Sequence, residues 1–253
     1  MTLRYPAGFM LAAFLLLHVP SPAFPADAGA RDNHHLEIEV GPAWQARNDF
    51  AIPGDTGTRV SLPDEGPVPA ARATYVWDFG ERWSARFLAA PLSIDTDFTS
   101  DGPIQFQESV FPAGEPLTTH YEFNSYRFTF FYRFRTEGRW SFRGGFTGKV
   151  RDARIHLSGA GLSETKDDLG IVPLLYGGAR YETGGILALD LEIDALGSPQ
   201  GRAVDFSARL EFQAAERVRP YVGYRLLDGG ADNDEVYTFA RFHYGLAGVS
   251  LRF

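Results

Sequence analysis

Two histidines in this sequence have neighbours that could support nucleophilic or acid–base chemistry. His156 and Ser158 are two residues apart, so on a β-strand they would share one face, and a serine beside a base is what acyl transfer requires. His243 lies ten residues before the C-terminus, and Asp49 and Asp228 close the two segments expected to flank it. A histidine beside a carboxylate suits general acid–base catalysis. Alternatively, all five residues are polar strand ends or members of ion networks.

Aspartates in the expected loops are candidates for Ca²⁺, which prefers several oxygen ligands. Their spacing lacks the glycine and the final glutamate of an EF-hand loop, and solvated turns account for them as well. His34 and His35 are adjacent and would point to opposite faces of a strand, so they make a poor metal pair. We expect no metal and no other cofactor. The aspartates are Asp95, Asp97, Asp101, Asp228, Asp232 and Asp234.

The composition favours one large β domain. With 253 residues, of which 44% are hydrophobic and 22% charged, the chain can fold around an ordered interior. Aromatic residues make up 14%, and 27 Gly and 16 Pro supply many short turns. The formal net charge of −8 gives no electrostatic reason to bind nucleic acid. The chain has no cysteine, which excludes thiol catalysis and disulfides.

The first 28 residues have the pattern of a secretory signal peptide. Arg4 precedes an apolar run at 9–19, three prolines follow, and 26–28 fits a small-residue cleavage site. The apolar run is too short to span a bilayer as a helix, which takes about 20 residues. We therefore predict a signal peptide at 1–28 and one exported domain at 29–253.

From residue 33 onward, apolar side chains recur at every second position, which is the period of a β-strand. We count ten such segments, and an even number suits a closed antiparallel barrel with both termini on one side. The alternation slips near Pro91, at 151–152 and at 245–248, where we expect β-bulges. The segments are 33–47, 70–80, 82–96, 119–136, 139–157, 170–182, 185–196, 202–214, 217–228 and 235–253.

A soluble barrel would show the same alternation with its apolar face inward, but three features favour a membrane barrel. Connections after the even-numbered segments are tight, and aromatic residues such as Trp77, Trp83 and Trp140 flank these turns, as in an interfacial girdle. The chain also stops inside its last segment, at Phe253. Connections after the odd-numbered segments are mostly long, at 48–69, 97–118, 158–169 and 229–234.

In these features, residues 33–253 resemble the outer-membrane β-barrels of Gram-negative bacteria. The resemblance implies short periplasmic turns, long extracellular loops and a location in the outer membrane. It implies contact with outer-membrane lipid and lipopolysaccharide, and recognition of Phe253 by the barrel-assembly machinery. We expect a monomer. His156 and Ser158 resemble the His-x-Ser pair of an outer-membrane lipid A deacylase, and His243 with a nearby carboxylate resembles the site of the ten-stranded omptin proteases.

The face opposite the apolar one carries charges of both signs, and a ten-stranded lumen is narrow enough for them to meet. We expect Leu189, near mid-span, to face lipid together with Phe130, Phe142, Phe206 and Leu210. We expect salt bridges across the lumen between basic groups of the fourth and fifth segments and acidic groups of the seventh and eighth, with no continuous water path. The predicted lumen network is Glu37, Glu39, Arg127, Arg133, Arg143, Lys149, Arg151, Asp190, Glu192, Asp194, Asp205, Arg209 and Glu211.

These expectations favour a non-enzymatic barrel with an envelope-structural or surface-interaction role. Two alternatives stay open: a narrow pore, and an outer-membrane enzyme such as a deacylase or a protease. A pore would require a lumen that the ion pairs leave open. An enzyme would require His156 to contact Ser158, or His243 to contact Asp49 or Asp228.

Overall fold

A computed structural model describes residues 33–134 and 138–253, so the predicted signal peptide lies outside the described residues. It contains no helix long and apolar enough to cross a membrane within those ranges. The strands are β1 (His34–Ala51), β2 (Val60–Ser61), β3 (Glu65–Phe79), β4 (Trp83–Ala90), β5 (Ser93–Thr99), β6 (Ile104–Phe106), β7 (Ser109–Phe111), β8 (Pro116–Phe134), β9 (Trp140–Gly159), β10 (Leu162–Glu182), β11 (Leu187–Ser198), β12 (Gly201–Phe212), β13 (Val218–Asp232) and β14 (Tyr237–Arg252).

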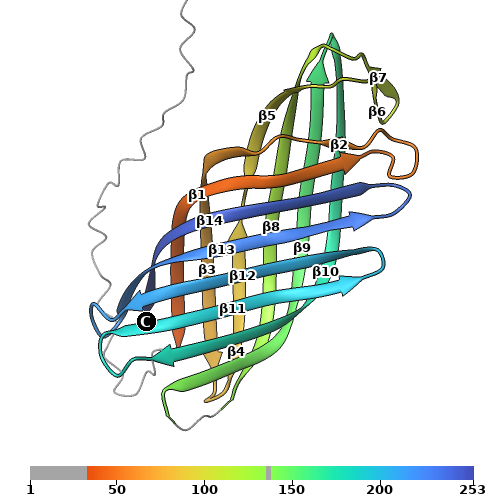
Figure 1. The fold of residues 1–253 in the computed structure, drawn as a ribbon. Helices are drawn as coiled ribbons and strands as arrows, with labels where there is room; N and C mark the ends of the chain where they lie inside the picture. The colour runs from red at the N-terminus through yellow and green to blue at the C-terminus, as the bar shows by residue number, and fades with distance from the viewer. Residues whose placement is uncertain (1–32, 135–137) are drawn as a thin grey trace, which may run out of the picture. The chain divides into compact units, whose positions relative to one another are not determined.

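The strands close into an antiparallel barrel whose wall has ten strand positions, as predicted (Figure 1). β4 and β5 together form one wall position, because both pair with β8 in the same register on either side of Pro91. β14 pairs with β1 along its length, from Leu36 opposite Leu251 to Ala51 opposite Tyr237, so no wall strand is left as an open sheet edge there. His34 and Phe253 exchange backbone hydrogen bonds, which places both ends of the barrel domain beside the tight turns.

The connections differ from the expected lopsided pattern in two places, at 229–234 and at 158–169. The predicted long loop at 229–234 is wrong, because β13 runs to Asp232, β14 begins at Tyr237, and only residues 233–236 join them. The predicted long loop at 158–169 is wrong: β9 and β10 continue through it and join at a two-residue turn, Ala160–Gly161. Both residues adopt positive φ (51° and 78°), which suits a tight hairpin. Long connections occur only at 52–64 and 100–115 within the described ranges. As a result, β8, β9 and β10 rise beyond the neighbouring β11 and β12 (Figure 1).

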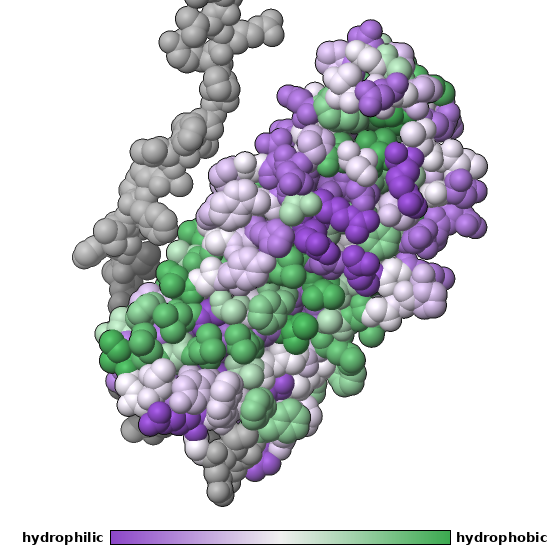
Figure 2. Space-filling view, viewed as in Figure 1, coloured by the Kyte–Doolittle hydropathy of each residue, from purple (hydrophilic) through white to green (hydrophobic). Residues whose placement is uncertain are grey.

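In the lower section of the barrel, nearest the tight turns, apolar side chains face outward and polar ones face the lumen. Phe130, Phe142 and Leu210 are exposed on the outside, whereas Asp205 and Arg209 are buried inside, as the alternation predicted. Figure 2 shows apolar residues gathered over the lower part of one face and hydrophilic ones above them. Because lipid offers no hydrogen-bond partners, this outer face suits a bilayer while the closed sheet satisfies the backbone.

Leu189 also faces outward, but it does not lie near mid-span as we expected. It pairs with Tyr181, and Tyr181 pairs with Trp140 at the tight-turn end. The rings of Tyr181 and Trp140 are in contact, with centroids 4.9 Å apart. Leu189 therefore lies beside the aromatic girdle, and Leu191 is closer to the middle of the apolar run on β11.

In the upper section the apolar side chains lie on the inner face and the polar ones on the outer face, and the strand register along β9 does not change. Along β9, Lys149 and Ile155 both point inward and Val150 and Arg154 both point outward, while pairing with β8 and β10 runs unbroken. The inner face becomes apolar and the outer face polar, which is the reversal expected of a wall that passes from lipid into water. The bulges expected at 151–152 and 245–248 are therefore wrong, and at Pro91 the strand breaks but keeps its register.

The register between β1 and β3 shifts between Ala43 and Gln45, and a β-bulge occurs in β1 between Gln45 and Arg47, opposite β14. The extra residue lets buried Gln45 and buried Asn48 both face inward, although they are three positions apart, and an amide hydrogen bond of 2.9 Å joins them. Arg47 and Asp49 consequently both face outward. The bulge therefore determines the face on which one of the candidate acids lies.

The two long connections fold onto the inner face of the upper section. The β6–β7 hairpin places Phe106 and Phe111 in an apolar core with Phe50 and Leu157, and all four side chains are fully buried. A parallel bridge between Ile52 and Phe106 joins the two connections. The upper section thus has a packed core of the kind found in soluble proteins.

Candidate functional site

The centre of the lumen is crossed by a buried layer of ion pairs. Arg127 of β8 contacts Asp194 of β11 at 3.1 Å and also forms an ion pair with Asp205 of β12, on the opposite wall of the barrel. These three side chains are 1%, 5% and 6% exposed. Both Arg127 contacts join wall strands that lie three or four positions apart in the sheet order, so they bridge the lumen rather than adjacent strands.

Further arginines complete this layer. Arg225 of β13 makes a bidentate contact with Asp205, with distances of 2.7 and 2.5 Å. Arg86 of β4 reaches across to Asp194 at 3.0 Å and to Glu192 at 3.3 Å. Bidentate, charge-assisted contacts of this kind fix both geometry and orientation.

A second layer lies closer to the tight turns. Asp190 accepts contacts from Arg143 at 2.8 Å and from Arg209 at 3.2 Å. Arg209 also binds Glu37 of β1 at 2.8 Å and lies 3.9 Å from Glu211. Every one of these residues was expected in the lumen network.

Four members of the predicted network lie in the lumen but do not bridge it. Arg133 pairs with Asp78, and Arg151 pairs with Asp168 on the adjacent β10. Lys149 lies over the ring of Phe123, with its Nζ 4.5 Å from the centroid. The buried carboxylate of Glu39 accepts a long hydrogen bond of 3.4 Å from the Tyr221 hydroxyl.

Several partners of the network lie outside the predicted set, among them Asp78 and Tyr176. Asp78 binds Arg133 and accepts hydrogen bonds from Ser84 at 2.8 Å and from His35 at 3.0 Å. The Tyr176 hydroxyl donates to Glu192 at 2.7 Å. The alternation around Trp77 and Phe79 would have placed Asp78 inward. Because Asp78 lies close to the tight turn, the predicted network does not include it.

The His156–Ser158 pair is not assembled for acyl transfer. Both residues lie on the polar outer face of the upper section, as their two-residue spacing predicts. The His156 Nδ1, however, is 2.8 Å from the Thr165 hydroxyl, and the Ser158 hydroxyl donates to the Thr118 carbonyl at 3.5 Å. Within the described residues no hydrogen bond joins His156 to Ser158.

His243 does not meet either candidate carboxylate. It faces outward on β14, and its Nδ1 is 2.6 Å from the Tyr224 hydroxyl. Asp49 is bound by Arg47 at 2.6 Å. Asp228 faces outward between Arg202 and Arg241, each at 2.7 Å. We expected these groups at the barrel mouth, but the parity of each strand places them on its outer surface instead.

Besides Asp228, two of the candidate calcium ligands, Asp95 and Asp97, contact other side chains. Asp95 contacts the His120 Nδ1 at 2.5 Å, and Asp97 accepts a hydrogen bond from Thr118 at 2.7 Å. Hydrogen bonds from His120 to Asp95 and to Glu122 raise the pKa of the His120 imidazole above its ordinary value. No cluster of three or more potential ligands that could hold a metal occurs in residues 33–134 and 138–253.

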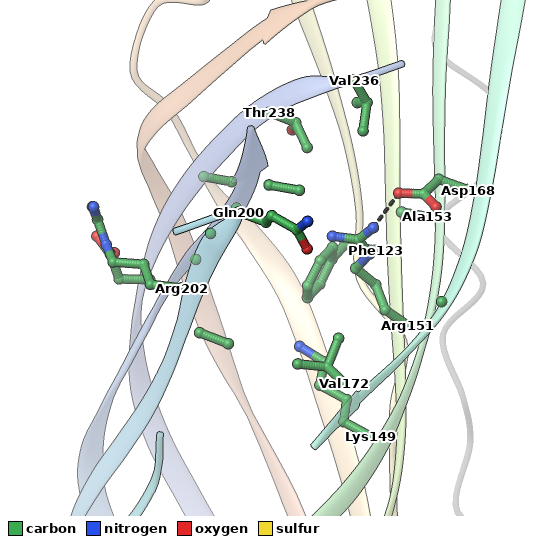
Figure 3. A pocket seen from close by; sticks show the side chains of 18 of the residues that line it. Phe123, Lys149, Arg151, Ala153, Asp168, Val172, Gln200, Arg202, Val236 and Thr238 are labelled. Carbon is green, nitrogen blue, oxygen red and sulfur yellow. Dashed lines mark hydrogen bonds and ion pairs between the residues drawn. The ribbon is translucent and has the colours of Figure 1, made fainter. Parts of the chain in front are cut away.

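Above the ion-pair layer lies a cavity of about 450 Å³ (Figure 3). Its apolar wall includes Phe123, Leu227 and Phe242, and Lys149 and Arg151 supply positive charge. A smaller cavity of about 170 Å³ lies on the tight-turn side. None of Arg127, Asp194 and Asp205 lines either cavity, because their contacts fill the space between the two.

Comparison with solved structures identifies the architecture. The outer membrane protease OmpT from Escherichia coli is similar over 88% of this chain and 98% of its own, with a TM-score of 0.57 and 10% sequence identity. This chain has the fold of an outer-membrane β-barrel. The transport unit of the autotransporter AIDA-I from E. coli has a TM-score of 0.46 at 7% identity, covering 91% of this chain and 94% of its own. No protein-family model and no curated protein sequence matches this chain.

Proposed function

We propose that this chain is a non-enzymatic, non-conducting protein of the Gram-negative outer membrane, with an envelope-structural or surface-interaction role. The observation that carries the proposal is the buried ion-pair layer of Arg127, Asp194 and Asp205. It joins opposite walls of the lumen and separates the two cavities.

The outer surface supports the membrane location. Apolar side chains form the outside of the lower section, with Trp77, Trp83 and Trp140 near the tight turns. Such rings prefer the bilayer interface. In this placement the polar upper section stands in water outside the cell, where its long strands and folded connections offer a rigid surface. Export by the 1–28 segment and assembly through recognition of Phe253 are parts of the same proposal.

The positions of the catalytic candidates support a non-enzymatic role. His156 is bound to Thr165, and His243 is bound to Tyr224. Neither contact is the serine or carboxylate partner that the deacylase or the protease alternative requires. Mass analysis of lipid A from cells with and without the gene tests this part: a lost acyl chain in the presence of the protein would contradict it.

Planar-bilayer recording tests the sealed lumen. The wild-type protein is expected to show no steady unitary openings. The variant Arg127→Ala/Asp205→Ala preserves net charge but removes the central pair, and it is expected to conduct. Arg154→Ala/Asp167→Ala serves as the matched control, because it also preserves net charge and removes an ion pair on the outside of the upper section. Steady, ion-selective openings from the wild type would favour the narrow pore instead.

A further inference from the structure

The wall of the barrel is incomplete beside the upper cavity. β10 pairs with β11 only from Leu175 onward, so from Leu162 to Leu174 its sole partner in the described sheet is β9. β11 and β12 end at Ser198 and Gly201 and leave this stretch of β10 uncovered. Val172 of β10 and Leu196 of β11 both line the cavity, which therefore reaches the gap between the two strands.

The gap opens at the upper limit of the apolar outer band. Ile171 faces outward next to it and is 81% exposed, and its partner across the sheet is Val150. One pair further up, the outer face changes to Asp152 opposite Leu169. In a bilayer this level is the boundary between acyl chains and head groups. The cavity thus communicates with the lipid interface from the side.

Two ammonium groups that line the cavity, those of Lys149 and Lys166, have no ion-pair partner among the described residues, and Lys149 is the buried one. Lys149 is 3% exposed, lines the cavity, and rests against Phe123. No carboxylate lies within ion-pair distance of it in the part of the chain that the structure describes. Arg151, by contrast, is neutralised by Asp168 (Figure 3). A buried ammonium is costly unless an anion or a π face compensates it, and Phe123 supplies only the weaker of these.

We propose that this cavity binds one long-chain amphiphile with an anionic head group, of the fatty-acid class. The carboxylate lies at Lys149, and the chain runs along the apolar wall of Phe123 and Leu227 and leaves through the gap between β10 and β11 toward the bilayer. The volume of about 450 Å³ lies within the usual range for small-molecule sites, about 300–1,000 Å³. The proposal does not depend on whether the lumen conducts.

The test uses the full chain refolded in phosphatidylcholine vesicles with two photoactivatable probes, a palmitate bearing a diazirine in its chain and the corresponding alcohol. Palmitate labelling is expected on cavity residues of β8, β10 and β11. Lys149→Met should lower it about tenfold, while Lys149→Arg retains it and labelling by the alcohol does not change. Equal palmitate labelling of the wild type and Lys149→Met would overturn the assignment of the head group.

A second pair of variants tests the cavity without altering charge. Val172→Trp projects a large ring into the cavity, and Leu169→Trp places the same ring on the outer face of the same strand, away from the cavity lining. Labelling by both probes should fall at least fivefold in Val172→Trp and stay unchanged in Leu169→Trp. If Val172→Trp folds and is labelled like the wild type, the cavity is not the binding site. Folding of every variant is checked by its heat-dependent shift in gel electrophoresis.

Discussion

Replacing Asp205 by Ala is the most direct test of a dry, ion-paired lumen. The substitution removes both contacts of the Arg225 guanidinium, at 2.7 and 2.5 Å, and one of the contacts of Arg127. Arg127 keeps Asp194 at 3.1 Å, so Arg225 is the group that loses its carboxylate partner. Arg225 keeps its contact with the ring of Tyr244, whose centroid is 5.1 Å away.

The magnitude follows from the burial of the pair. Two unit charges about 4 Å apart attract by about 4 kcal/mol at an effective dielectric near 20, before desolvation is counted. Removing one partner of a buried pair leaves the other charge uncompensated and costs about 3–5 kcal/mol. Since Asp205 and Arg225 are 6% and 4% exposed, we expect Asp205→Ala to lower the free energy of unfolding by about 3–5 kcal/mol.

The assay is urea unfolding from lipid vesicles, followed by the fluorescence of the four tryptophans. Asp167→Ala is the control, because Asp167 is 67% exposed in its ion pair with Arg154 and should cost less than about 1 kcal/mol. The double variant Asp205→Ala/Arg225→Met should be less destabilised than the sum of the single variants by about 1–3 kcal/mol. A loss of less than about 1 kcal/mol in Asp205→Ala would mean that water screens the lumen, and it would refute the reasoning.

Two further predictions concern the outer face. Leu191→Arg, in the middle of the apolar run, should cost about 2–4 kcal/mol of unfolding free energy, and Leu189→Arg, beside the girdle, should cost less; equal stability of Leu191→Arg and wild type would contradict the lipid-facing assignment. Contacts with Asp95 and Glu122 raise the pKa of His120, so protonated His120 stabilises the folded protein. This contribution to the free energy of unfolding is complete below the unfolded-state pKa, about 6.5, and is lost as pH rises through the higher folded-state pKa. NMR titration of His120 should show this raised pKa, and Asp95→Asn should lower it; an unchanged midpoint in Asp95→Asn would remove Asp95 as the main cause.

The sequence by itself determined the strands and the sides of most of them. Two-residue alternation is a local property, since successive side chains of a strand point to opposite faces. It therefore predicted ten wall strands, the outward position of Phe130 and the inward position of Asp205 before any contact was known. Opposite charges on two walls of a narrow barrel also predicted that Arg127 and Asp205 could meet.

Only the tertiary structure decided what surrounds each face. Val150 and Arg154 point to the same side of β9, but Val150 lies in the apolar band and Arg154 in the polar upper section. The sequence pattern therefore indicated a bulge, although the strand is continuous. The bulge in β1, which places Asp49 outside, also depends on pairing with two other strands. The cavity beside Lys149 exists because β10 extends beyond its pairing with β11. This difference in extent depends on both strands together, so neither strand's own sequence reveals it.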